Sequence, residues 1–101
     1  MTFTVIIKQE AYNDIKEAYD YYEYKQIGVG EVFLNALQKR FDDLSKSPNN
    51  YSFINEYNSK VFRDVKVKKF PFVIVFEIIN ETVIVYAVHN CYKHPSKKIY
   101  R

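Results

Sequence analysis

Apolar side chains in the first half of the chain recur at offsets of three and four, which is the spacing of amphipathic helices. A short apolar run at the very start indicates a strand instead. Gly28 and Gly30 interrupt the helical pattern, so we expect two helices joined by a short connection as an antiparallel hairpin. A Ser-Pro-Asn-Asn stretch ends the second helix. The predicted elements are a strand over residues 2–7 and helices over residues 9–25 and 31–46.

The second half is rich in β-branched and aromatic residues, which favours strands over residues 61–67, 72–79 and 82–88. Asn80 and Glu81 form a plausible two-residue hairpin turn. The sequence therefore predicts an α+β domain with the order strand, helix, helix, strand, strand, strand. In it, an antiparallel helical hairpin packs on a mostly antiparallel four-stranded sheet.

The turn at residues 80 and 81 sets a register for the last hairpin. It pairs Ile79 with Thr82, and regular continuation pairs Val75 with Tyr86 and Phe72 with His89. One face of the hairpin is then nearly all apolar, and we expect the helices to cover it. Its members would be Phe72, Ile74, Phe76, Ile78, Val83, Val85, Ala87 and His89.

Composition is that of one folded domain spanning residues 1–101. Hydrophobic residues make up 48% of the chain, and only 2 Gly and 3 Pro interrupt it. No apolar run approaches the roughly 18 residues of a membrane span. The N-terminus lacks the features of a signal peptide. The single Cys91 cannot form an internal disulfide, so a cytoplasmic location is expected.

Charge is distributed unevenly along the chain. Residues 1–50 carry six Lys/Arg against eight Asp/Glu, a net of −2, whereas residues 51–101 carry nine against four, a net of +5. This asymmetry favours a polyanionic or acidic partner for the C-terminal half, and a solvated basic surface is the alternative interpretation.

Several stretches taken in order resemble the RelE/ParE superfamily of toxins. They are Ala11-x-x-Asp14-Ile15-x-x-Ala18-x-x-Tyr21-Tyr22, Gly28-x-Gly30-x-x-Phe33-x-x-x-Leu37, Leu44-x-x-x-Pro48, Arg63, Phe70-Pro71-Phe72-x-Ile74-x-Phe76, and Val83-x-Val85-x-Ala87-Val88-His89 followed by Pro95. The helical part looks more like ParE than like RelE.

The resemblance implies the toxin of a bacterial type II toxin–antitoxin module, neutralised by a cognate antitoxin protein. It implies one of two targets, either DNA gyrase or mRNA on the ribosome, and contact with promoter DNA only through the antitoxin complex. A member that has lost toxicity and only binds a partner is the remaining alternative. No membrane partner is expected.

If the protein cleaves mRNA as RelE-like toxins do, it needs proton-transfer groups and cations around one phosphodiester. Arg63 matches the family's strand arginine, and its guanidinium suits a phosphate. His89 and Tyr92 are candidates for proton transfer. Each has a structural alternative: Arg63 as an anchor, His89 as the end of the core and Tyr92 as a packed tail residue.

Ribosome-dependent relatives often carry adjacent catalytic groups such as His-Tyr at the end of the last strand. This chain has two residues between His89 and Tyr92, which favours gyrase inhibition over catalysis. Lys66, Lys68, Lys69 and Lys93 are candidate phosphate-binding residues. No metal-ligand spacing or phosphate-binding glycine loop is found, so neither a metal nor a cofactor is expected.

Overall fold

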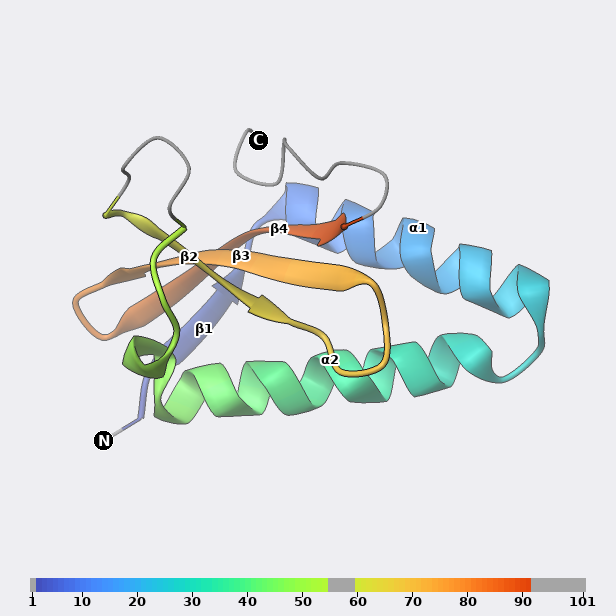
Figure 1. The fold of residues 1–101 in the computed structure, drawn as a ribbon, viewed down its shortest axis with the longest axis horizontal. Coiled ribbons are helices and arrows are strands. Elements are labelled where there is room, and N and C mark those ends of the chain that lie inside the picture. Colours follow the sequence, from blue (N-terminus) through green and yellow to red (C-terminus); the bar gives the residue numbers. More distant parts are fainter. Residues whose placement is uncertain (1, 55–59, 92–101) are drawn as a thin grey trace.

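The computed structural model of the protein describes residues 2–54 and 60–91 (Figure 1). The α+β class and the predicted order of elements are confirmed. The elements are β1 (Thr4–Ile7), α1 (Gln9–Lys25), α2 (Val29–Lys46), the short 3₁₀ helix η1 (Pro48–Asn50), β2 (Phe62–Lys66), β3 (Phe72–Ile79) and β4 (Thr82–Asn90).

The four strands form one mixed sheet with the order β1-β4-β3-β2. β1 lies parallel to β4, and the other two pairs are antiparallel, as the sequence predicted for most of the sheet. The two helices pack against each other and cover one face of this sheet (Figure 1). A backbone hydrogen bond of 2.7 Å from Phe3 N–H to the Ser45 carbonyl ties the start of β1 to the end of α2.

The main core lies between the helical hairpin and the sheet. Ring contacts are concentrated at one point of it, where the Phe33 ring lies with its centroid 5.2–5.4 Å from those of Tyr22, Phe70 and Phe72. Phe33 therefore joins both helices to the segment that connects β2 and β3. The other fully enclosed core side chains include Leu37, Leu44, Ile74, Phe76, Val83 and Val85.

The junction between the helices is fixed by one carboxylate. Glu23 accepts hydrogen bonds of 3.0 Å from the backbone N–H groups of Gly28 and Gly30, which are among the unsatisfied donors at the start of α2. Gly28 has a left-handed φ of 97°, and a Cβ on Gly30 would lie 2.7 Å from the Glu23 carboxylate. The second helix therefore begins at Val29, two residues earlier than predicted, because both glycines belong to its capping structure.

The register of the last hairpin differs from the predicted one beyond its middle. Ile79 pairs with Thr82 as expected, but a bulge leaves Tyr86 as an extra residue on β4, so Val75 pairs with Ala87 and Phe72 with Asn90. The predicted pairs Val75–Tyr86 and Phe72–His89 are therefore wrong. Because Tyr86 is one extra residue, the side chain of each later residue of β4 lies on the face of the sheet opposite to the predicted one.

This reversal also corrects the predicted core face. Val88 turns toward the helices and joins the main core. Ala87 instead packs with Val75, Ile54 and Phe62 on the opposite face of the sheet.

Candidate functional site

Arg63 lies on β2 and is held by the backbone of the segment that follows α2. Its Nη1 atom donates a hydrogen bond of 2.6 Å to the carbonyl of Tyr51 and a longer one of 3.5 Å to that of Asn49. Its guanidinium carbon also lies 3.9 Å from the centroid of the Phe53 ring. The charged group is thus engaged by three neighbours within the chain, and the side chain is half-buried.

The same segment is tied to β2 by its own backbone. Phe53 forms an isolated antiparallel bridge with Arg63, and the N–H of Ile54 donates 2.9 Å to the carbonyl of Phe62. Arg63 therefore anchors residues 49–54 along the outer edge of the sheet. This is an anchoring role, which was the structural alternative for Arg63 in the sequence analysis.

His89 lies on the face of the sheet that the helices do not cover. The bulge at Tyr86 places its side chain on the same face as Ala87, opposite Val73 on β3. The expectation that His89 lies under the helices is therefore wrong, although the side chain is buried, with 2% of its surface exposed.

Arg63 and His89 are not brought together by the fold. Arg63 pairs with Phe76, whose side chain is in the core under the helices, whereas His89 pairs with Val73 three residues earlier on β3. The two candidate groups therefore lie on opposite faces of the sheet. Tyr92 and Lys93, the other candidates in the tail, lie outside the described residues.

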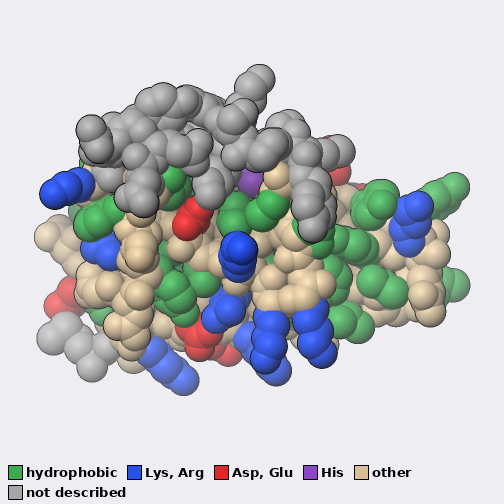
Figure 2. Space-filling view, viewed as in Figure 1, with side chains coloured by type: hydrophobic (Ala, Val, Ile, Leu, Met, Phe, Trp, Pro, Cys, Tyr) green, Lys and Arg blue, Asp and Glu red, His purple; other side chains and the backbone are tan. Residues whose placement is uncertain are grey.

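The lysines Lys66, Lys68 and Lys69 form a basic corner where β2 ends and the chain turns into β3. All three are exposed. Figure 2 shows Lys and Arg side chains gathered along the side of the molecule where α2 and this turn lie.

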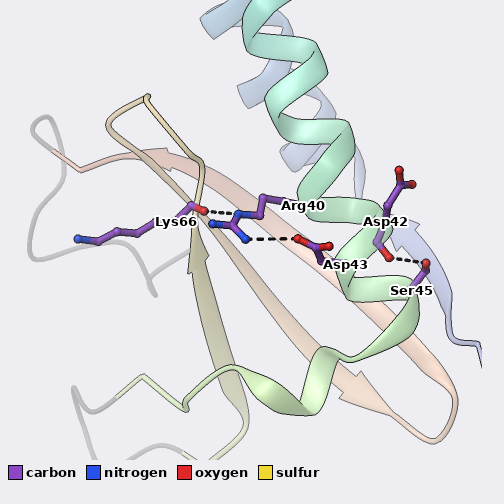
Figure 3. A network of polar contacts seen from close by, with 5 residues as sticks. All are labelled: Arg40, Asp42, Asp43, Ser45 and Lys66. Atoms are coloured by element: carbon purple, nitrogen blue, oxygen red, sulfur yellow. Dashed lines mark hydrogen bonds and ion pairs between the residues drawn. The ribbon is translucent and has the colours of Figure 1, made fainter.

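Arg40 of α2 holds the basic corner in place (Figure 3). Its Nε donates a hydrogen bond of 2.8 Å to the carbonyl of Lys66, and its Nη1 lies 3.3 Å from the Asp43 carboxylate. The Lys66 side chain points away from α2, as Figure 3 shows. Arg40 thus occupies a backbone acceptor on the edge strand β2 and also pairs with the nearest acid on α2.

A polar contact that sequence reasoning missed connects the first helix to the last strand. The Asp14 carboxylate accepts a hydrogen bond of 3.0 Å from the N–H of Val88. β1 pairs with β4 only as far as Val85, so Asp14 binds a backbone N–H that β1 does not reach. The sequence did contain a signal for this, because Asp14 lies three residues from Ala11 and four from Ala18 on the buried face of the helix.

A second such contact lies on the uncovered face of the sheet. The Tyr86 hydroxyl donates a hydrogen bond of 2.7 Å to the Glu77 carboxylate, and the Tyr86 ring lies edge-on to Phe62 with 5.5 Å between centroids. Hydrogen bonding to Glu77, with some desolvation, raises the pKa of Tyr86 to about 12. Tyr86 follows the core residue Val85, and Glu77 follows the core residue Phe76, so both side chains lie on the uncovered face of the sheet.

We expect this contact to weaken at alkaline pH. Because the folded-state pKa is raised above the ordinary value of 10.0, the stabilisation is complete below pH 10 and is lost as the pH rises toward 12. Denaturant unfolding of the wild type and Tyr86→Phe should show a stability difference at about pH 9 that shrinks at about pH 11. A difference that stays constant over this range would contradict the assignment.

Within residues 2–54 and 60–91, no three His, Cys, Asp or Glu side chains lie close enough together to hold a metal ion. Neither of the described helices combines the length and apolarity needed to cross a lipid bilayer.

The described residues place two helices on one face of a mixed four-stranded sheet. A solved structure described as the chromosomal ParDE TA system from P. aeruginosa shares this fold with a TM-score of 0.74 and 12% sequence identity, over 87% of this chain and 95% of that chain. A search of curated protein sequences gives no match.

The sequence profile described as the ParE toxin of the type II toxin–antitoxin system parDE matches residues 5–90. The chain belongs to the ParE toxin family, within the RelE/ParE superfamily that its motifs resemble.

Proposed function

We propose that this ParE-family toxin inhibits DNA gyrase by binding it, without catalysing a reaction, and that a cognate antitoxin neutralises it. The observation that carries the proposal is the match to ParE toxins over residues 5–90, since gyrase is the target that likeness to ParE implies. The protein would act in the cytoplasm, and it would reach promoter DNA in complex with its antitoxin.

The positions of the candidate catalytic residues support a binding mechanism. Cleavage of RNA requires a proton acceptor, a proton donor and a cation around the same phosphodiester. Arg63 and His89 lie on opposite faces of the sheet, and the Arg63 guanidinium already contacts Tyr51 and Phe53. A phosphate bound at one of these residues would therefore be remote from the other.

Induction of the gene should arrest growth, with DNA breaks and a DNA-damage response preceding any fall in translation. Purified protein should inhibit supercoiling by gyrase and leave mRNA intact in a translation extract. Co-expression of the neighbouring gene should restore growth if that gene encodes the antitoxin.

The controls separate the competing interpretations. Discrete mRNA cuts with unaffected supercoiling would replace the proposal with ribosome-dependent cleavage. Normal growth at verified soluble expression would contradict toxicity and leave a protein that only binds a partner.

A further inference from the structure

The basic corner is carried by a well-defined turn. Phe70 N–H donates 3.3 Å to the Val67 carbonyl, and Val67 N–H donates 2.9 Å to the Phe72 carbonyl. Val67 and Phe72 are buried in the main core on either side. The turn between them therefore presents Lys68 and Lys69 from a fixed position, which reduces the entropy lost when a ligand is bound.

Lys69 occupies a backbone conformation that suits glycine better than lysine. Its φ of 71° is in the left-handed region, where a side chain with a Cβ is disfavoured. Strain of this kind persists where a residue is kept for another reason, so an exposed lysine at this position suggests a role for its charge.

The neighbouring charges determine what kind of ligand fits. The Arg40 guanidinium already contacts the Lys66 carbonyl and the Asp43 carboxylate. Among the described residues of the corner, it is therefore not open to bind the carboxylate of a ligand in bidentate fashion. The corner offers instead three ammonium groups, which act as point charges and suit backbone phosphates without reading sequence.

We propose that the basic corner binds the phosphate backbone of duplex DNA, so that the toxin engages gyrase together with the DNA that gyrase holds. This inference rests on gyrase being the target. Lys66, Lys68 and Lys69 would position the protein along the duplex, and the binding would be independent of base sequence and sensitive to salt.

The first test measures DNA binding by the purified protein alone. Fluorescence anisotropy with a labelled duplex of arbitrary sequence should show binding at low salt. The double variant Lys68→Glu/Lys69→Glu should bind at least about tenfold more weakly. The slope of its log affinity against log salt concentration should be less steep, by the amount that about two lost phosphate contacts would cause. The matched control Lys8→Glu/Lys25→Glu changes the net charge equally at the two ends of α1 and should retain most of the affinity.

No DNA binding by the wild type, or equal losses in both double variants, would overturn the inference. Thermal unfolding of both variants checks that neither change has damaged the fold. Tighter binding to an acidic peptide than to DNA would likewise overturn it, in favour of a protein ligand.

The second test separates this inference from the proposed function. If the wild type inhibits gyrase, Lys68→Glu/Lys69→Glu should need several times more protein for half-inhibition than Lys8→Glu/Lys25→Glu. Equal inhibition by both would overturn a role for the corner on gyrase-bound DNA. Failure of the wild type to inhibit gyrase contradicts the proposed function and is seen independently of the DNA-binding result.

Lys69→Gly provides a variant whose backbone conformation at this position is allowed without steric strain. Glycine relieves the left-handed strain, so the melting temperature should stay the same or rise. DNA affinity should nevertheless fall because one ammonium group is lost. An affinity equal to that of the wild type would show that Lys69 takes no part in binding.

Discussion

Replacing Phe33 with alanine should lower the free energy of unfolding by about 3–5 kcal/mol, the largest effect we expect from a single substitution. The Phe33 side chain is completely buried, and its ring contacts those of Tyr22, Phe70 and Phe72. Truncation would leave a cavity where the two helices meet the segment after β2. A domain of this size has a total stability of about 5–15 kcal/mol, so a large share of it would be lost.

Denaturant unfolding measures this effect directly. Val32→Ala provides a neighbouring control, because Val32 is 55% exposed and its truncation should change stability by no more than about 0.5 kcal/mol. Phe33→Leu should fall between the two because it fills part of the cavity. Equal stabilities of Phe33→Ala and Val32→Ala would show that the aromatic cluster contributes little to the fold.

Arg63→Ala should lower the free energy of unfolding by about 1.5–3 kcal/mol, the usual range for hydrogen bonds to a charged group. The substitution removes the 2.6 Å hydrogen bond to the Tyr51 carbonyl and the contact with the Phe53 ring. Arg63→Lys should recover only part of the loss, because an ammonium group keeps the charge but lacks the planar fork.

Three measurements on the same Arg63 variants distinguish an anchor from a phosphate-binding residue. For an anchor, the melting temperature, antitoxin binding and toxicity should fall together. For a phosphate-binding residue, toxicity should disappear while the other two stay at wild-type values. The contacts of Arg63 lead us to expect the first pattern, and an unchanged melting temperature in Arg63→Ala would refute it.

The elements of the fold were predictable because helical and strand periods change cleanly at the middle of the chain. The register was predictable only from the turn as far as Phe76 and Val85. Val83, Ile84 and Val85 are adjacent apolar residues, just as Ala87 and Val88 are, so the apolar pattern of β4 does not mark the bulge at Tyr86. A bulge depends on packing against both neighbours, which the pattern of one strand does not contain.

The candidate site was less predictable than the fold. Arg63 stood out as the one charged residue on its strand face, but its partners are backbone carbonyls of an irregular segment. A backbone carbonyl is present at every residue and leaves no signature in the sequence. The contact between Arg40 and Lys66 was not predictable for the same reason, because Arg40 donates to the backbone carbonyl of Lys66. The position of His89 was mispredicted because it follows the bulge.

The pairing of the first strand with the last has a consequence for synthesis on the ribosome. β1 is made before its partner residues Thr82 to Val85, and Asp14 is made before its partner Val88. The helical hairpin, held by the local contacts of Glu23, can form early. The sheet cannot close until β4 has left the ribosome, so a nascent chain lacks the complete surface of the folded protein. A partner that is already present can therefore meet each new molecule as it finishes folding.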